Sequence, residues 1–221
     1  MNTTMENTLM DKLMNYISDI QFGYPILLKD VAHKFHNDEE DYQKTRNTIS
    51  KYLNRLVQKG VLRKFDDGVF FKSTNTPFGE IPINSGALLD KLYINDEAEN
   101  KNIGYRVGAN VLSDIGISNN IENKVTIVTN KYLAKKILDK ISFNVELVKP
   151  VTAITQDNHL YLQLLDTVKN IHQYHLTNED IGNKLVNYME ARGIIANVLF
   201  KYADQYYSRK TTENLVTLLA S

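Results

Sequence analysis

The sequence predicts an α+β fold organised as two domains. Apolar residues recur at helical spacing in the N-terminal part of the chain and again toward the C-terminus, which predicts helices in both. Short runs rich in β-branched and aromatic residues lie between them and predict strands. The polar stretch Ser73–Pro77 has the composition of a linker. We therefore expect one domain at residues 1–75, and a mixed α/β domain with a helical C-terminal part at residues 76–221.

The first domain is expected to begin with two helices. Apolar side chains at every third or fourth position predict one helix at residues 9–20 and a shorter one at residues 28–35. Gly23 suits the C-terminal end of a helix, and Pro25 blocks helix continuation through its neighbourhood. We therefore place the end of the first helix near Gly23.

A third helix and a hairpin follow. The acidic run at residues 38–41 favours the start of a helix by a few tenths of a kcal/mol or more, and Gly60 stands where the helix should stop. Two β-rich runs, residues 61–65 and 69–73, flank Asp66-Asp67-Gly68, whose Asp-Gly pair is typical of a hairpin turn. Two helices, a third helix and a hairpin, in this order, are typical of a winged helix-turn-helix.

The charge of the chain is zero overall but unevenly distributed. There are 26 basic and 26 acidic residues, so no net field draws the whole molecule to nucleic acid. Residues 42–65 nevertheless hold Lys and Arg without one Asp or Glu. At about 100° per residue, the polar side chains of the third helix fall on an arc opposite its apolar face. They are Lys44, Asn47, Lys51, Arg55 and Gln58, with Thr48 at the margin and Arg46 nearer the core edge.

This arc is the predicted binding site for double-stranded DNA. A recognition helix needs side chains that reach base edges and cations that neutralise phosphate. The predicted DNA-binding residues are Lys44, Arg46, Asn47, Thr48, Lys51 and Arg55 on the third helix, with Arg63, Lys64 and Lys72 on the hairpin. Asn47 has the groups to pair with adenine. The competing interpretation, an ordinary solvated helix face, explains the polarity but not the absence of acids.

The second domain is expected to mix strands and helices. Strands are predicted at residues 124–129 and 143–148, and residues 131–140 fit either a helix or a strand. Thr177 and Asp180 resemble a capping box before the helix that follows them. Helices are predicted at residues 88–93, 105–115, 160–171, 181–192, 194–207 and 213–219.

Several classes of protein are excluded or disfavoured by what the sequence lacks. Without cysteine, disulfides, thiolate zinc sites and cysteine nucleophiles are impossible. The N-terminus lacks the basic start and apolar stretch of a signal peptide, and no segment runs apolar for about 18 residues. We therefore expect a cytoplasmic protein without membrane contact.

No catalytic or metal-binding motif stands out, so neither an enzyme nor a cofactor or metal is expected. His33 with His36, and His172 with His175, have the i, i+3 spacing of paired ligands but lack an obvious third ligand. Glu146 and Lys149 resemble the carboxylate and lysine of metal-dependent nucleases, yet at i, i+3 they point to opposite faces of a strand. They fit strand-end charge better.

Five segments resemble a known family, the AbiEi-like antitoxins of the abortive-infection AbiE type. They span most of the chain from Ile49 to Ile171, and their order is more specific than any one of them. The segments are ISKYLNRLVQKGVLRKFDDGVFFKS at 49–73, TPFGEIP at 76–82, GYRVGANVLSDIGIS at 104–118, VTIVTN at 125–130 and LYLQLLDTVKNI at 160–171.

The resemblance implies a type IV toxin-antitoxin role. In that family the first domain represses its own operon by binding inverted repeats, and the second opposes a nucleotidyltransferase-like toxin without forming a stable complex with it. The family's DNA-reading helix corresponds to residues 44–55, and its basic wing to Arg63, Lys64 and Lys72. The run at residues 36–41 is longer and more acidic than the usual turn, which leaves the docking angle of the third helix open.

Three hypotheses for the function therefore remain. The first is a DNA-binding autorepressor and antitoxin, acting as a homodimer on half-sites about 10 base pairs apart; without a toxin partner it becomes a plain transcription regulator. The second is a winged-helix module that binds protein and never DNA. The third is a nuclease within residues 76–221, which the missing carboxylate cluster disfavours.

Overall fold

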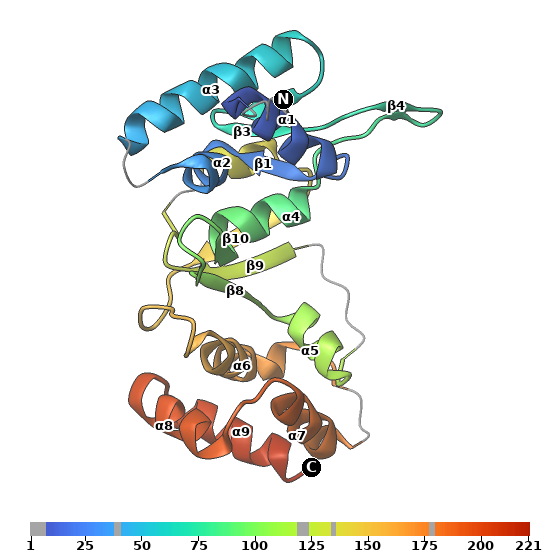
Figure 1. Cartoon of the computed structure of the whole chain (residues 1–221). Coiled ribbons are helices and arrows are strands. Elements are labelled where there is room, and N and C mark those ends of the chain that lie inside the picture. The colour runs from blue at the N-terminus through green and yellow to red at the C-terminus, as the bar shows by residue number, and fades with distance from the viewer. Residues whose placement is uncertain (1–7, 38–40, 119–123, 134–135, 177–179) are drawn as a thin grey trace, which may run out of the picture. The chain divides into compact units, whose positions relative to one another are not determined.

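The computed structural model is a mixed α+β protein, in agreement with the α+β class that the sequence predicts (Figure 1). It describes residues 8–37, 41–118, 124–133, 136–176 and 180–221. The chain divides into two compact units. The N-terminal unit is Met1–Asp90 with Glu97–Glu99, and the C-terminal unit is Lys91–Asp96 with Asn100–Ser221.

The N-terminal unit contains the three predicted helices and the predicted hairpin, with ends within a few residues of those expected. The sequence did not predict its first strand, which is three residues long and lacks a periodic signal. The elements are α1 (Leu9–Asp19), β1 (Pro25–Leu27), α2 (Leu28–Phe35), α3 (Tyr42–Gln58), β2 (Arg63–Asp66), β3 (Val69–Phe71), β4 (Asn75–Thr76), β5 (Gly79–Glu80) and α4 (Ser85–Leu89).

Local chemistry sets the ends of these helices. Thr8 and Asp11 form a capping box at the start of α1, and the Asp41 carboxylate accepts a hydrogen bond of 2.9 Å from the backbone N–H of Gln43 at the start of α3. The other predicted acids of that run, residues 38–40, lie outside the described residues. Gly23, at φ 79°, ends the loop after α1, where a Cβ would come within 2.8 Å of the Pro82 carbonyl oxygen.

The three helices pack on a small antiparallel sheet of order β1-β3-β2. Ile26 of β1 is opposite Phe70 of β3, and Lys64 of β2 is opposite the same Phe70 on the other side. Asp67 and Gly68 form the turn between β2 and β3, as predicted. The core that joins sheet and helices consists of Leu13, Ile17, Ile26, Leu28, Val31, Ile49, Leu53, Leu56, Leu62 and Phe70.

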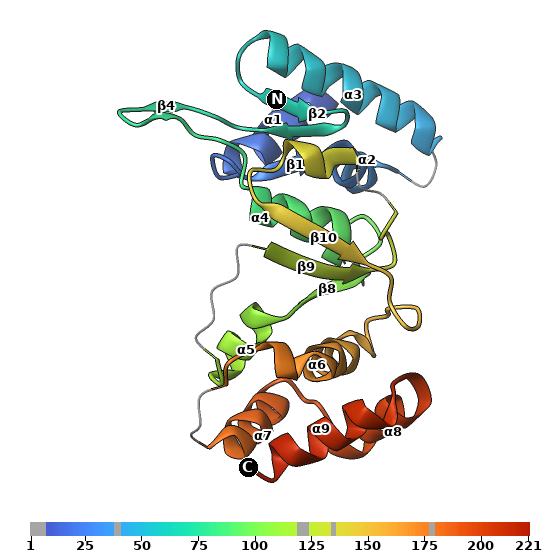
Figure 2. The same cartoon turned by 180° about the vertical axis from the view of Figure 1, so that it is seen from behind.

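A second hairpin, β4–β5, occupies the stretch that the sequence predicted to be a linker. The Thr76 hydroxyl donates a hydrogen bond of 2.8 Å to the Gly79 carbonyl oxygen and accepts one of 3.2 Å from the Phe78 N–H. These bonds close the turn around Pro77 and Phe78, so a polar run of this composition folds as a hairpin rather than a linker. The hairpin extends away from the other elements of the N-terminal unit in Figures 1 and 2.

The C-terminal unit contains one three-stranded sheet and most of the helices described in the chain. Its first turn continues directly from α4 and spans the boundary between the units. The elements are a π-helical turn (Asp90–Ile94), β6 (Asn95–Asp96), β7 (Lys101–Asn102), β8 (Gly104–Val107), α5 (Ala109–Ile115), β9 (Lys124–Thr129), a 3₁₀ helix (Lys136–Lys140), β10 (Asn144–Val148), α6 (His159–Lys169), a 3₁₀ turn (Ile171–Gln173), α7 (Ile181–Ala191), α8 (Ala196–Tyr206) and α9 (Arg209–Leu219).

The sheet has the order β10-β9-β8, with β9 parallel to β10 and antiparallel to β8. Strands β9 and β10 confirm two predictions. The helix predicted at residues 105–115 is wrong in its first part, because Gly104–Val107 pairs with β9 as strand β8. Gly108, at φ 90°, then separates this strand from α5.

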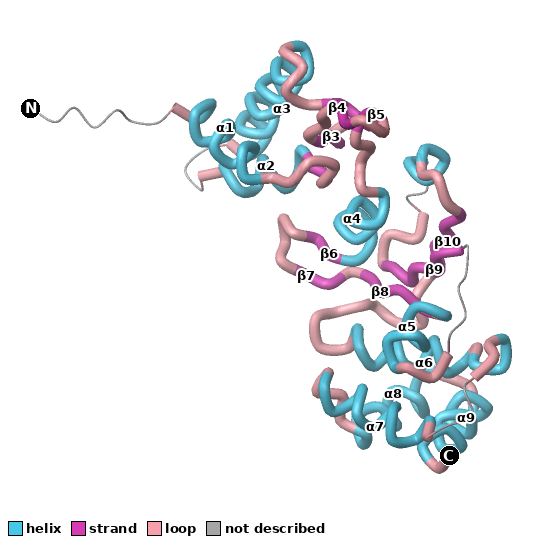
Figure 3. Tube along the Cα trace, turned by 90° about the vertical axis from the view of Figure 1, so that its right-hand side faces the viewer, coloured by secondary structure: helices cyan, strands magenta, loops and turns pink. Residues whose placement is uncertain are grey.

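Helices α5 to α9 build the larger core of the C-terminal unit, and Figure 3 shows them gathered together. The predicted capping box before α7 involves Thr177, which lies outside the described residues, while Asp180 takes the N-cap position without a side-chain hydrogen bond to the helix. Within residues 131–140, Lys136–Lys140 forms a 3₁₀ helix and residues 134–135 are not described. None of the described helices combines the length and apolar character that a membrane span requires.

Candidate nucleic-acid interface

Helix α3 separates its side chains as its spacing predicted. Thr45, Ile49, Leu53 and Leu56 are buried against the rest of the N-terminal unit. The opposite side is exposed and carries Lys44, Asn47, Lys51, Arg55 and Gln58. We call these five residues the basic face. In Figure 1 the helix lies along one side of its unit, with α1, α2 and the sheet on the other side.

Among the described residues, no acid forms an ion pair with the lysines of the basic face, Lys44 and Lys51. The Arg55 guanidinium lies 5.8 Å from the centre of the Tyr52 ring, a cation–π contact that leaves its charge in place. The face is therefore locally positive although the chain is neutral overall.

The polar residues of α3 differ in how free their groups are. The Asn47 amide oxygen accepts a hydrogen bond of 3.4 Å from the Gln43 amide, which leaves its own NH₂ group exposed to solvent. The Thr48 hydroxyl donates a 3.0 Å bond to the Lys44 carbonyl within the helix. Arg46 is half-buried at the edge of the core, where the sequence placed it.

Two predicted hairpin residues, Arg63 and Lys64, are exposed but paired with acids. The Arg63 Nε donates a hydrogen bond of 2.6 Å to Glu80 of β5, and this bond lowers the pKa of the Glu80 carboxyl. The Lys64 ammonium lies 2.7 Å from an Asp67 carboxylate oxygen. Because both pairs are exposed, each contributes little to stability, yet each offsets positive charge on this hairpin.

Lys72, the third predicted hairpin residue, contacts the end of helix α1. Its ammonium donates hydrogen bonds of 2.8 Å to the Ser18 carbonyl and 2.7 Å to the Ile20 carbonyl, and it lies 5.0 Å from the centre of the Phe22 ring. A cation at the C-terminal end of a helix stabilises the unsatisfied carbonyls there. The structure therefore does not bring Lys72 together with the basic face.

Sequence reasoning missed two features of this region. Lys59, the C-cap residue of α3, is exposed and extends the line of cations beyond Arg55; its place in the acid-free interval was the available signal. Phe78, at the tip of the β4–β5 hairpin, is fully exposed. The prediction of a linker in this stretch gave no reason to expect a large apolar side chain on a projecting turn.

No family model, curated protein or solved structure matches the chain significantly. The site must therefore be interpreted from its own chemistry. An exposed helix face with ammonium, guanidinium and amide groups can bind a polyanion and hydrogen-bond to base edges. Among the described residues, no three His, Asp or Glu side chains cluster as a metal ion would require.

Proposed function

We propose that the N-terminal unit is a winged helix-turn-helix that binds double-stranded DNA through the basic face of α3, and that the chain regulates transcription in the cytoplasm. The observation that carries the proposal is the basic face itself. It is exposed, it belongs to an interval without Asp or Glu, and its lysines have no ion-pair partner among the described residues. Such a surface is the electrostatic signature of phosphate binding.

The order of elements supports the same proposal. The chain runs α1-β1-α2-α3-β2-β3, with the strands in one antiparallel sheet. In winged helix-turn-helix domains the last helix of the three enters the major groove, and the hairpin after it lies beside the duplex. The run between α2 and α3 is longer than usual. Across this run the His36 ring makes a T-shaped contact with the Tyr42 ring, with 5.4 Å between the ring centres, so the end of α2 and the start of α3 are in contact.

The proposed roles follow from position along α3. Lys44, Lys51 and Arg55 neutralise backbone phosphates, and Asn47 reads a base edge from the N-terminal half of the helix. Arg46 and Thr48, which are half-buried, contribute through local positioning. Arg63 and Lys64 add phosphate contacts only to the extent that DNA displaces Glu80 and Asp67.

Charge reversal on the basic face tests the proposal. The double variant Lys44→Glu, Lys51→Glu should bind duplex DNA from the region upstream of its own gene about a hundredfold more weakly, because two charge-assisted contacts become repulsive. Lys201→Glu, Lys210→Glu is a matched control on exposed positions of α8 and α9. Fluorescence anisotropy gives both affinities. Equal binding by the two variants, with unchanged circular dichroism, would contradict the proposal.

The resemblance to AbiEi-like antitoxins gives the proposed DNA binding a biological setting. We propose that two chains bind inverted repeats in front of their own operon, with half-sites about 10 base pairs apart, and that the second domain counters a nucleotidyltransferase-like toxin without a stable complex. Growth of cells carrying such a toxin from the neighbouring gene tests this. The Lys44→Glu, Lys51→Glu variant should still protect those cells but no longer repress the operon.

One observation favours a second candidate function, a module that binds protein. The fully exposed Phe78 ring on a projecting turn has the character of a contact residue, since burying such a ring yields about 1.5–3 kcal/mol. A pull-down of the toxin after nuclease treatment distinguishes the two candidate functions, because protein–protein binding persists when DNA is removed. The protein-binding module requires that Phe78→Ser abolishes this binding and that Lys44→Glu, Lys51→Glu retains it.

A further inference from the structure

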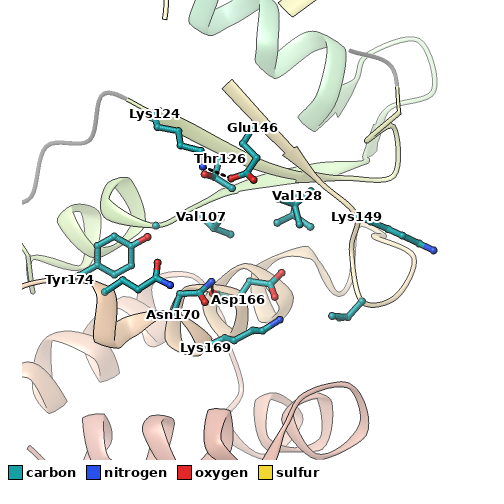
Figure 4. Close-up of a pocket in the computed structure, with 14 residues that line it drawn as sticks. Val107, Lys124, Thr126, Val128, Glu146, Lys149, Asp166, Lys169, Asn170 and Tyr174 are labelled. Atoms are coloured by element: carbon teal, nitrogen blue, oxygen red, sulfur yellow. Dashed lines mark hydrogen bonds and ion pairs between the residues drawn. The ribbon is translucent and has the colours of Figure 1, made fainter. Parts of the chain in front are cut away.

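The C-terminal unit contains a pocket of about 250 Å³ that the proposed DNA binding does not use. It lies between the sheet and the C-terminal half of α6 (Figure 4). Val107, Thr126 and Val128 project from the sheet toward the helix, and Asp166 and Asn170 project from the helix toward the sheet. Its volume is slightly below that of sites for drug-sized ligands, so it suits a smaller metabolite.

Strand register explains why these side chains share one face. Val107 of β8 is opposite Thr126 of β9, and Thr126 is opposite Glu146 of β10. Paired residues in neighbouring strands point to the same side of a sheet. Helix α6 is fixed over β8 by two bonds, from the Gln163 amide to the Arg106 carbonyl, 2.9 Å, and from the Tyr105 hydroxyl to the Asp166 carboxylate, 2.6 Å.

The two carboxylates in the pocket are already engaged. The Lys124 ammonium lies 2.6 Å from Glu146, so this pair is neutral in sum. The Asp166 carboxylate accepts the Tyr105 hydroxyl, and burial, the largest effect, raises the pKa of its carboxyl. Neither group therefore opposes an incoming anion as strongly as a free carboxylate would.

Two lysines, Lys149 and Lys169, line the pocket, and the charge of Lys169 already acts on the Asp166 carboxyl. Lys149 extends from the end of β10 at the rim, with its ammonium 5.9 Å from the centre of the Tyr132 ring, and Lys169 lies beside Asp166 on α6. In the described parts of the chain neither forms an ion pair. In Figure 4 the Lys149 ammonium points away from the pocket, so Lys149 must turn inward to join Lys169 at a bound anion; lysine is a common phosphate ligand.

The remaining lining suits a hydroxylated carbon skeleton. Thr126, Asn170 and Gln173 offer hydroxyl and amide groups that both donate and accept hydrogen bonds. Val107 and Val128 are buried and give the pocket an apolar wall. A few polar groups on a partly apolar wall are the usual composition of a small-molecule site.

We propose that this pocket binds a small organic phosphate of the size of a sugar phosphate. Lys169 contacts the phosphate, and Lys149 turns its ammonium from the Tyr132 ring to contact it from the rim. The side chains of Thr126, Asn170 and Gln173 bind the hydroxyl groups, and the valines contact the carbon skeleton. The proposal does not depend on DNA binding by the N-terminal unit, so either can fail without the other.

Titration calorimetry of the full chain with glycerol 3-phosphate, ribose 5-phosphate and glucose 6-phosphate tests the proposal. At least one of them should bind with a Kd below about 1 mM, and at least tenfold more tightly than both inorganic phosphate and the same compound without its phosphate. If none of the three binds more tightly than inorganic phosphate, the proposal is overturned.

Variants locate the binding. Lys149→Ala, Lys169→Ala should weaken the best compound about tenfold or more, since charge-assisted contacts are lost. The matched control Lys201→Ala, Lys210→Ala removes the same charge from α8 and α9 and should leave the affinity unchanged. Thr126→Val, which is close in shape, should weaken the sugar phosphate but not inorganic phosphate. Equal affinity of the pocket and control variants, with unchanged circular dichroism, also overturns the proposal.

Discussion

Asp166 carries a carboxylate into the C-terminal unit beside two tyrosine hydroxyls. The Tyr105 hydroxyl donates a hydrogen bond of 2.6 Å to it, the Tyr207 hydroxyl donates one of 3.3 Å to the Leu162 carbonyl oxygen, and burial raises the pKa of all three groups. A carboxyl whose pKa is raised on folding holds its proton more tightly in the folded state than in the unfolded state. Its favourable contribution to stability is therefore present at low pH and is lost as the pH rises through the folded-state pKa.

Replacement of Asp166 by Asn tests this sign. Asn keeps an acceptor for a tyrosine hydroxyl but cannot ionise. The usual pKa of an Asp carboxyl is 3.8. As the pH rises from this value toward neutrality, the free energy of unfolding of the wild-type chain should fall relative to that of the Asp166→Asn variant. Urea unfolding of both proteins across this range measures the difference, with exposed Glu213→Gln as control. A difference independent of pH would contradict the raised pKa.

Lys72 should act on stability more than on DNA. Lys72→Met keeps the apolar stem but loses two hydrogen bonds to the end of α1, so the free energy of unfolding should fall by about 1.5–3 kcal/mol. Affinity for DNA should change less than in Lys51→Ala. Denaturant unfolding and anisotropy on the same samples measure both quantities. Unchanged stability of Lys72→Met together with a large loss of affinity for DNA would contradict this prediction and indicate that Lys72 contacts DNA.

The sequence predicted the exposure of single side chains well only where the helical repeat determines it. The exposure of Lys44, Asn47 and Lys51 follows from 100° spacing on α3. The partner of Arg63 does not, because Glu80 is 17 residues away on a hairpin that the composition concealed. Contacts of this kind depend on tertiary structure, which a local pattern does not contain.

At the scale of elements, strand β8 depends on a close approach of backbone at Gly104. A Cβ at this position would clash with the Tyr93 carbonyl oxygen and come within 2.8 Å of the Val128 carbonyl oxygen. Glycine is therefore required for packing here, where its φ is not in the left-handed region. The strand begins where only the smallest residue fits.

Gly104→Ala should lower the free energy of unfolding by about 1–3 kcal/mol, because backbone atoms must move to admit the methyl group. Gly86→Ala is the matched control, since its Cβ would meet nothing closer than the Asn84 side chain at 3.4 Å. Thermal or urea unfolding of both variants measures the effect. Equal stability of the two variants would show that the backbone around Gly104 admits a methyl group without loss of free energy of unfolding.

Elements were predictable in proportion to their length and periodicity. Helices α1, α3 and α6 carry clear apolar repeats and were predicted within a few residues. Strands β1 and β8 were missed because three or four residues cannot distinguish helical from extended spacing. Pairing with distant strands decides such segments, as β9 does for β8.

At the scale of the whole molecule, the net charge of zero hides a chain with a sharply localised basic surface. Binding to DNA should therefore depend on salt through a few contacts only. With roughly three to five phosphates neutralised per chain, log K should fall with log salt by about 0.9 for each contact. The total charge would predict no such slope.

Lys51→Ala should reduce that salt slope by about one contact and weaken binding to all sequences alike. Anisotropy titrations at several salt concentrations, on operator and on unrelated duplex, measure the slope. The control Lys210→Ala should keep the wild-type slope. A Lys51→Ala slope equal to that of wild type would place this lysine away from the phosphates.

The domain organisation shows the limit of composition at the largest scale. Two domains were expected with a boundary after residue 75, and the compact units of the structure divide near Asp90, beyond the β4–β5 hairpin. The stretch Ser73–Pro77 was interpreted as a linker because composition alone does not reveal the hydrogen bonds of the Thr76 side chain to the turn.

The central claim, that the exposed face of α3 touches duplex DNA, is tested most directly by site-specific crosslinking. The chain has no cysteine, so Asn47→Cys introduces a unique thiol on the basic face, and Asp204→Cys introduces one on the exposed side of α8. A duplex carrying thiol-reactive tethers on its bases should form a disulfide with Asn47→Cys at defined positions and none with Asp204→Cys. Crosslinking from Asp204→Cys alone, or equally from both, would contradict the account.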